Sequence, residues 1–515
     1  MNRLALWLDN PILIKHVRSR LRRMQLISSV AVVVIIALCI VMLGYSYDKL
    51  SGGGAFGGLM ALQSIILGVV GASQVASSVS RARESGIFEF HRASPMPAPA
   101  VTLGFFFGAP IREYALFAVT LPFSLICVAM GRPSPIGFVQ LMVPLVLTAW
   151  ALHALALFNS LVWKPSKSGA RGLIGVILFV VFFSGSMFTG FSRAAALIDE
   201  SPTLGFFWFQ LPWLVVLALD LFPAIGFLLT AASRKIASER APALTKPQAI
   251  ACLVTGQFLL VGTLWNVGWF GYYALGVLYS TMAAAFVLTL TITPNLGEYT
   301  KGVRKAVRAG RSHPSPWSDR GLNRLALVCL CASVLVGPTV AWQVIEKPAP
   351  WASQMGEVSY SLPIAIGVFV VAYFGLALQY FQIRFGKRAS IFMALFLFAA
   401  WILPLLVGSI AAAGAARSGG SAVVGEILAS LSPIAGIALS AGFANTATDA
   451  HQAVQAAALV PAIVFAFLFN NLVVSARRRI DAEVHPVASG PAPDPLRDPE
   501  PKPEGLPEIA EPLVL

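Results

Sequence analysis

Charged side chains are scarce in this sequence. Asp, Glu, Lys and Arg make up 12% of its 515 residues, and hydrophobic residues make up 57%, whereas soluble domains carry about 25% charged residues. This scarcity excludes an ordinary soluble fold. Apolar runs of about 20 residues, long enough to cross ~30 Å of hydrocarbon, recur from end to end. Because these runs are uniformly apolar and do not alternate, they predict an all-α, polytopic integral membrane helical bundle.

The sequence also lacks the residue patterns of catalytic and metal sites. Its five cysteines lie in apolar runs, and Cys329 and Cys331 have no cluster of ligands beside them, so all five are expected to be buried thiols. The six histidines are scattered, without the paired spacing of a metal site. No G-x-S-x-G and no phosphate-binding P-loop occur. We therefore predict no enzymatic activity, no bound metal or cofactor and no nucleotide site.

Basic residues outnumber acidic ones by 37 to 23, and the formal net charge is +14. In a soluble protein this excess would suggest a nucleic-acid partner. Here the Lys and Arg residues cluster at the ends of apolar runs, where the positive-inside rule places them, so no nucleic-acid partner is expected. With these clusters on the inner side, the chain is a multi-pass protein of the cell membrane with both termini cytoplasmic. The twelve predicted spans are residues 24–45, 59–79, 101–130, 136–162, 172–192, 207–232, 249–268, 271–293, 325–345, 361–383, 389–413 and 454–474.

Four segments are distinguished along the chain. Residues 1–23 form a cytoplasmic N-terminus, residues 24–232 and 233–474 form two six-span halves, and residues 475–515 form a tail whose Pro, Asp and Glu content predicts disorder. In the N-terminus, Asn10 caps a helix with apolar residues on one face and Lys and Arg on the other. This pattern favours an interfacial helix lying against anionic lipid headgroups. The alternative is that it is only the start of the first span.

Residues 423–443 are apolar enough to form a further span. A further span would place Arg477, Arg478 and Arg479 outside, against the positive-inside rule. The segment is also rich in Gly, Ser and Pro. We therefore predict that residues 423–452 form a re-entrant or surface-lying hairpin on the outer side, before the last span.

Three ionisable residues lie inside predicted spans. Asp220 is near the middle of one span, and we expect it to face the interior of the bundle. Arg112 and Glu113 are adjacent in another span and point about 100° apart on a helix, so each is expected to need its own partner or a water-filled cavity. All three are candidates for an intramembrane pathway, with purely structural pairing as the alternative.

The segment from Ser80 to Pro97 is short, charged and interrupted by Gly86, and it lies between two long apolar runs. It alternates charged residues with Ile and Phe. Exposed aromatic side chains are costly unless a partner covers them, and buried aromatics are typical anchors of interfaces. The pattern therefore indicates a cytoplasmic helix that contacts another protein. An amphipathic segment lying on the bilayer surface is the alternative.

This segment resembles the E-R-E-x-G-T-x-E-x-L…P motif of the type-2 (ABC-2) ABC transporter permeases. In that family the motif forms the coupling helix between the second and third spans, which is its position here. The order of Arg81 and Arg83 departs from the motif, as does Ile87, which stands where the family has Thr, and twelve spans exceed the usual six. The matching residues are Arg83, Glu84, Ser85, Gly86, Ile87, Phe88, Glu89 and Phe90, followed by Ser94 and Pro95.

The resemblance implies the membrane-spanning subunit of an ATP-driven transporter, an exporter of the cell inner membrane. A separate ABC ATPase subunit binds the ATP and docks on a coupling helix over residues 81–97. With twelve spans, either two copies of the chain still pair as a homodimer or the basic loop 294–324 serves as a second docking site. A plain positive-inside loop is the favoured interpretation of this basic stretch. The docking residues implied by the resemblance are Arg83, Glu84, Gly86, Ile87, Phe88, Glu89 and Phe90.

Two other classes remain open. An ion-coupled secondary transporter predicts a cavity around Asp220, Arg112 and Glu113, together with broken helices near the midplane. A membrane scaffold or embedded enzyme is the third class, which the lack of nucleophile and metal motifs disfavours.

Overall fold

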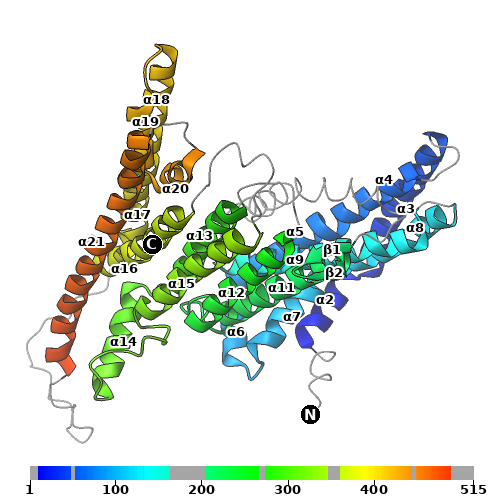
Figure 1. Ribbon diagram of the computed structural model, residues 1–515. Helices are drawn as coiled ribbons and strands as arrows, with labels where there is room; N and C mark the ends of the chain where they lie inside the picture. The colour runs from blue at the N-terminus through cyan, green and yellow to red at the C-terminus, as the bar shows by residue number, and fades with distance from the viewer. Residues whose placement is uncertain are drawn as a thin grey trace, which may run out of the picture.

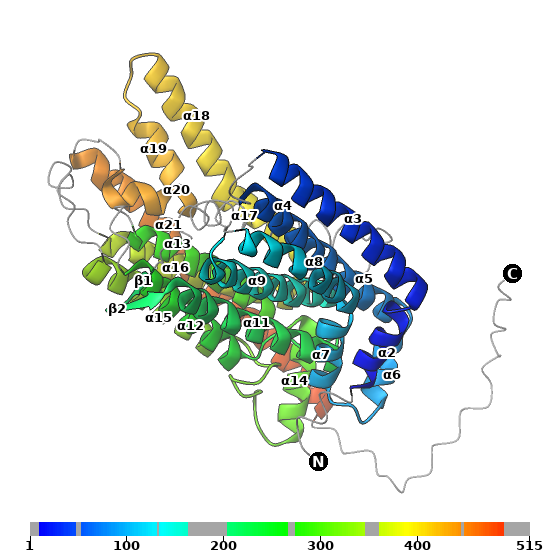
Figure 2. The same cartoon turned by 90° about the vertical axis from the view of Figure 1, so that its right-hand side faces the viewer.

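The computed structural model describes residues 10–47, 53–130, 133–162, 203–265, 273–345, 360–443 and 448–488. Helices dominate this part of the chain, and the all-α polytopic membrane fold is confirmed. The described strands are β1 (Thr203–Phe206) and β2 (Phe209–Pro212), which pair antiparallel in one small hairpin. Figures 1 and 2 show the helices as two neighbouring groups, one before and one after the α11–α12 turn.

The N-terminal group begins with a short helix, continues through long apolar ones and ends in the helix that follows the β-hairpin. A π-helical segment at Ile65–Val70 interrupts one of the long helices, and His153 Nε2 donates a 2.8 Å hydrogen bond to the carbonyl of Leu67 there. The helices are α2 (Pro11–Arg20), α3 (Arg23–Tyr47), α4 (Gly53–Ser64), α5 (Gly71–Glu84), α6 (Ile87–Ala93), α7 (Ala98–Gly108), α8 (Ile111–Ala129), α9 (Pro135–Val162) and α11 (Trp213–Ala237).

The C-terminal group holds the longest helix, α21, and a hairpin that bends sharply before it. Short π-helical or 3₁₀ segments occur at Ala341–Ile345, Gly386–Arg388, Phe398–Ile402 and Leu439–Phe443. The helices are α12 (Lys246–Leu264), α13 (Tyr273–Ile292), α14 (Leu296–Arg308), α15 (Arg324–Val340), α16 (Ser361–Phe385), α17 (Ala389–Leu397), α18 (Leu403–Arg417), α19 (Val423–Ser430), α20 (Pro433–Ala438) and α21 (Thr448–Ala488).

Ten of the described helices are long and apolar enough to cross a membrane, or eleven if the bent pair α19–α20 counts as one span. One of the ten runs from Ser361 to Arg417. As a straight helix it would be about 85 Å long, far more than the ~30 Å of a bilayer core. It instead folds back on itself, because Phe385 stacks on Phe392 at 4.0 Å and Trp401 donates to the Tyr373 hydroxyl at 2.7 Å. The two expected spans of this region are therefore an antiparallel pair.

The count of twelve spans stays a prediction, because the expected span 172–192 lies outside the described residues. The segment expected to form an outer hairpin is helical: α19 and α20 meet at an angle of 112°. Close backbone contact between α18 and α19 depends on glycine, since a Cβ at Gly408 would lie 2.2 Å from the Ala429 nitrogen.

The apolar core follows the same division into two groups. The larger cluster is built mainly from α12, α13, α15, α16 and α21, and a second cluster joins α2, α5, α6, α7, α9 and α11. In Figure 1, α2, α6 and α14 all lie toward one side of the molecule, which we call the basic side.

Three boundaries differ from the sequence-based expectation. The run 101–130 is two helices, because Pro110 lacks the backbone donor that would continue α7 and the next helix begins at Ile111. The run 207–232 begins with β2, and its helix starts only at Trp213. The tail is helical up to Ala488, because Ile480 and Val484 of α21 pack against α14. The disorder expected for residues 489–515 concerns positions outside the described residues.

Candidate functional site

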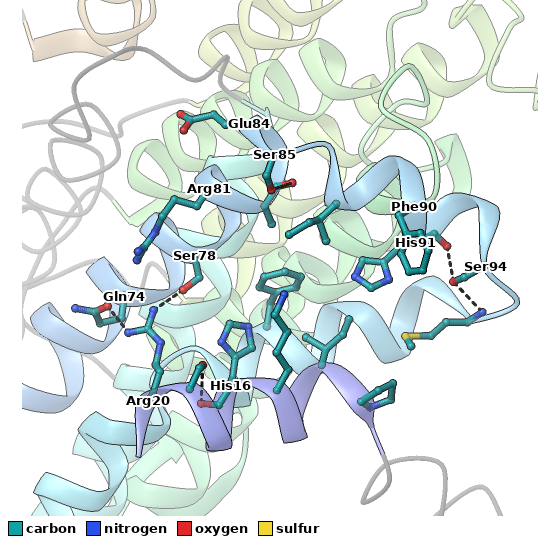
Figure 3. Close-up of a pocket in the computed structure, with 18 residues that line it drawn as sticks. His16, Arg20, Gln74, Ser78, Arg81, Glu84, Ser85, Phe90, His91 and Ser94 are labelled. Atoms are coloured by element: carbon teal, nitrogen blue, oxygen red, sulfur yellow. Dashed lines mark hydrogen bonds between the residues drawn. The ribbon is translucent and has the colours of Figure 1, made fainter. Parts of the chain in front are cut away.

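The basic side holds a cleft of about 1200 Å³ between α2 and the α5–α6 corner (Figure 3). α2 lies along one wall, the last turns of α5 and all of α6 form the other, and α7 supplies the floor. The lining residues are Pro11, Ile12, Lys15, His16, Ser19, Arg20, Gln74, Ser78, Arg81, Ala82, Glu84, Ser85, Ile87, Phe90, His91, Ser94, Met96 and Phe105.

The local sequence explains why α2 lies in this position. The helix begins as expected: the Asn10 side chain accepts from the backbone nitrogens of Ile12 and Leu13, and its amide donates 2.6 Å to the Ala100 carbonyl of α7. Glycines in α7 then permit close packing, since a Cβ on Gly104 would lie 2.7 Å from Ile12 Cβ. The predicted N-terminal helix is thus confirmed, and its apolar face packs on protein.

The opposite wall is formed where the chain turns from α5 into α6 at Gly86; we call this turn the α5–α6 corner. Gly86 adopts φ = 71°, a left-handed conformation that costs little only for glycine, and it ends α5 and starts α6. The coupling helix expected over 81–97 is therefore shorter than predicted: Arg81 to Glu84 belong to the span helix α5, and α6 covers only Ile87–Ala93. The segment does lie between two spans, at the basic side.

The aromatic residues of α6 point in opposite directions. Phe88 is 4% exposed and packs against Phe105 of α7 at 5.5 Å between ring centroids, whereas Phe90 is 71% exposed at the mouth of the cleft. The prediction that Phe88 is an exposed docking residue is wrong, because its ring is part of the core that fixes α6 to the membrane helices. Phe90 and the half-buried Ile87 remain available on this surface.

The charged residues of the α5–α6 corner likewise fall into two sets, those engaged within the protein and those exposed on its surface. Arg83 pairs with Glu239 and also donates 3.3 Å to the Leu161 carbonyl, so its guanidinium is engaged within the protein. Glu89 pairs with Arg92 in the same helix but is exposed. Glu84 is exposed and lines the cleft. Of the predicted docking residues, Glu84, Gly86, Glu89 and Phe90 are exposed, Ile87 is intermediate, and Arg83 and Phe88 are turned inward.

The walls of the cleft carry positive charge through Lys15 and Arg20 of α2 and Arg81 of α5. Arg20 of α2 donates to the side chains of Gln74 and Ser78 on α5, and so fastens α2 across the corner. Burial, together with the nearby charges of Arg20, Lys15 and Arg81, lowers the pKa of His16 to about 4. His16 is therefore neutral at physiological pH. Sequence reasoning missed this group, although Gln74 and Ser78 are four residues apart and share one face of α5.

The corner is also tied to the second group of helices through the turn between α11 and α12. On one side, Arg83 pairs with Glu239 and Arg92 Nε donates 2.9 Å to the Ile236 carbonyl. Glu239 accepts from Arg83, which holds the pKa of this carboxyl below its usual value. On the other side, Arg234 pairs with Asp319 of the loop after α14 at 2.6 Å. The turn thus contacts both groups at the basic side.

Lys246 strengthens the second attachment. It begins α12, is 1% exposed, and its Nζ donates to three backbone carbonyls of the loop after α14. The accepting carbonyls belong to Pro316 at 2.7 Å, Gly321 at 2.8 Å and Leu322 at 3.0 Å. All three donors of the ammonium are used, so this charge fixes the loop to the start of α12.

The ionisable residues predicted inside spans are not gathered at one place. Arg112 and Glu113 form an ion pair with each other at 2.9 Å, so the expectation that each needs its own partner is wrong. The long Arg112 side chain bends toward the adjacent Glu113 in the first turn of α8. The Glu113 side chain is fully buried. Asp220 is half-buried on α11, and within the described residues it makes no ion pair. No group of three potential metal-ligating side chains occurs in the described part of the chain.

The comparison with known families gives a match for the N-terminal part of the chain. The family model for ABC-2 type transporters matches residues 11–190, a range that contains α2 to α9 and the whole cleft. Residues 11–190 therefore form an ABC-2 type transporter domain, which supports an ABC-2 type permease. This confirms the resemblance carried by the segment around Gly86. The match ends before β1, so α11 to α21 of the permease lie outside it. No match was found among curated proteins or solved structures.

Proposed function

We propose that the permease is the membrane-spanning subunit of an ATP-driven exporter, and that a separate ATPase subunit docks in the cleft between α2 and α6. One observation supports this most directly: Phe90 is 71% exposed at the mouth of a cleft of about 1200 Å³, on helix α6, which is itself anchored in the core through Phe88. An exposed aromatic on a rigid element beside a concave surface is typical of an anchor that a partner buries. Glu84 and Glu89 supply charged contacts at the rim.

The direction of the chain in the membrane follows from charge. The basic side carries most of the exposed Lys and Arg residues between spans, and the positive-inside rule places it in the cytoplasm together with both termini. Twelve spans then alternate consistently, with the expected span 172–192 as one of them. The bent pair α19–α20 on the opposite side is the proposed re-entrant hairpin, packed on α16, α18 and α21 so that its bend is covered by protein.

The contacts of α6 suggest how force is transmitted. ATP-driven movement of the docked subunit displaces α6, and Phe88 carries the displacement into the membrane helices as a rigid body. Arg83 and Arg92 carry it to the α11–α12 turn. From there, Arg234 and Lys246 hold the loop that follows α14. The two groups of helices therefore move together. A second copy of the chain would provide the docking cleft for a second ATPase.

The test is reconstitution with a separate ABC ATPase subunit. We expect the permease to stimulate ATP hydrolysis and to lose both this stimulation and co-purification in the Glu84→Ala/Phe90→Ala variant. Trp208→Ala is the matched control, because Trp208 is an equally exposed aromatic (78%) on the β1–β2 turn, away from the cleft. A double variant that still binds and stimulates the ATPase like the native permease would exclude docking in this cleft.

An ion-coupled secondary transporter has one observation in its favour, the half-buried carboxylate of Asp220 within a span. The two functions differ in what Asp220→Asn does. We expect this variant to transport normally in the ATP-driven system. Loss of transport in Asp220→Asn, with no requirement for ATP, would favour the ion-coupled alternative.

A further inference from the structure

A second charged surface on the basic side lies on α14, outside the range matched by the family model. Asn295 caps this helix by accepting from the Glu298 nitrogen at 2.9 Å. One face is apolar and buried, with Tyr299 1% exposed and Val303 fully buried. The opposite face and the turn after it are basic and exposed. We call this surface the α14 basic face; it consists of Lys301, Arg304, Lys305, Arg308 and Arg311.

The α14 basic face is largely without counter-charges. Lys301 pairs with Glu298 at 3.3 Å. The other four cations make no ion pair with any residue that the structure describes. Five like charges on about 20 Å of helix repel one another. An acidic ligand that covered them would remove this repulsion.

The position of α14 points to a ligand attached at the end of α21. Tyr299 and Val303 pack against Ile480 and Val484, which follow the arginines that end the apolar part of α21. In Figure 1, α14 extends beside the end of α21, away from the rest of the molecule. α14 thus packs on the last turns of α21, after Arg477–Arg479 and shortly before residues 489–515.

The chain itself contains an acidic segment directly after α21 in the sequence. Residues 489–515 follow directly after Ala488, the last residue of α21, and their first carboxylate, Asp494, comes six positions later. Six carboxylates against two cations give the segment a net charge of −4. The acidic residues are Asp494, Asp498, Glu500, Glu504, Glu508 and Glu511, and the basic ones are Arg497 and Lys502.

We propose that residues 489–515 bind the α14 basic face of the same molecule. Length permits it, since 27 residues reach up to about 90 Å when extended and α14 is about 20 Å long. Attachment to α21, which packs on α14, gives the segment an effective concentration on the order of millimolar, so weak ion pairs suffice. The segment then covers the α14 basic face and competes with any other acidic partner. This proposal does not depend on how the ATPase docks.

The test is zero-length cross-linking of the full-length permease with a carbodiimide, which joins carboxylates to lysine amines in contact. Mass spectrometry should find residues 489–515 joined to Lys301 or Lys305 at low salt. The yield should fall at least about fivefold in ~0.5 M NaCl, where the Debye length is about 4 Å. A mixture of isotopically light and heavy protein should give links within one molecule only.

Two matched variants isolate the α14 basic face. The variant R304Q/R308Q/R311Q keeps both reactive lysines but removes three charges, and we expect the same loss of cross-link yield as in high salt. The control R18Q/R22Q/R23Q removes three exposed arginines at the N-terminal helices, which lie apart from α14 in Figure 1, and should leave the yield unchanged. All substituted side chains are exposed, so folding is not threatened.

Three results would overturn the proposal. The tail carboxylates could react with added glycinamide as in an unstructured peptide while giving no link to α14. They could link to lysines elsewhere, such as Lys15 on α2, as readily as to Lys301 and Lys305. Links only between light and heavy molecules would show that the segment binds a second copy of the chain.

Discussion

The opposite orientations of Phe88 and Phe90 make a quantitative prediction from two neighbouring residues of one helix. Phe88 is 4% exposed and contacts Phe105, in a cluster that joins α6 to α2, α7 and α11. Replacing it by alanine leaves a cavity and removes its apolar contacts, which costs about 3–5 kcal/mol for a buried phenylalanine. Phe88→Ala should therefore lower the midpoint of thermal unfolding of the detergent-solubilised permease, and it should weaken ATPase binding only by loosening α6.

Phe90→Ala should leave the stability nearly unchanged but weaken ATPase binding directly. The ring is 71% exposed, so its removal should change the free energy of unfolding by less than about 0.5 kcal/mol. As an interface anchor it should contribute about 2 kcal/mol or more to ATPase binding, which corresponds to roughly a 30-fold increase in Kd. The two variants thus differ in their main effect: Phe88→Ala reduces the stability of the fold, and Phe90→Ala reduces the affinity for the ATPase.

The assay combines thermal unfolding with ATPase binding measured on immobilised permease. Phe88→Leu is a useful intermediate, because it retains most of the apolar contact and should recover much of the lost stability. The reasoning would be refuted by a Phe90→Ala variant that is as unstable as Phe88→Ala. It would equally be refuted by a stable Phe88→Ala variant, since the ring then could not be part of the core that fixes α6.

Three further predictions concern the attachments of the cleft. Arg83→Glu should reduce the amount of substrate transported per ATP hydrolysed without abolishing ATPase binding. The charge-swapped variant Arg83→Glu/Glu239→Arg should restore part of this transport. No restored transport would mean that the ion pair does not transmit force. Lys246→Met should lower the free energy of unfolding by about 3 kcal/mol or more, because three backbone carbonyls lose their hydrogen-bond donor. An unchanged midpoint of thermal unfolding would contradict this prediction. The pKa of His16 is lowered from 6.5 to about 4, so His16 binds a proton more weakly in the folded protein than in the unfolded one. Its contribution to the free energy of unfolding should therefore fall as the pH drops from about 6.5 to 4 and stay constant above pH 6.5. His16→Gln should reduce that fall, and an identical pH profile of stability would refute the assignment.

Local sequence was a good guide wherever the deciding interaction lies within a few residues. Asn10 caps α2 as expected because the cap is formed by its own side chain and the next two backbone nitrogens. The motif around Gly86 lies between two spans at the basic side, and the family match covers it. The break in the run 101–130 was missed although Pro110 was visible, since proline is tolerated in membrane helices when neighbours satisfy the freed carbonyl groups.

The candidate site could be located from sequence but not resolved into its parts. Phe88 and Phe90 differ by two positions, about 200° on a helix, so one of them had to point inward, and only the location of Phe105 shows which. The pairing of Arg112 with Glu113 was equally hidden, because helix geometry gives the direction of each Cβ and not the reach of a long guanidinium.

By itself, the sequence determined that this is a helical membrane protein and where its basic side lies. The reason is that transfer into hydrocarbon and the charge asymmetry of the membrane act on composition, residue by residue. Only the tertiary structure decided which side chains of the cleft are free. That depends on contacts between residues far apart in the chain, such as Arg83 with Glu239 and Arg20 with Gln74, which no local pattern records.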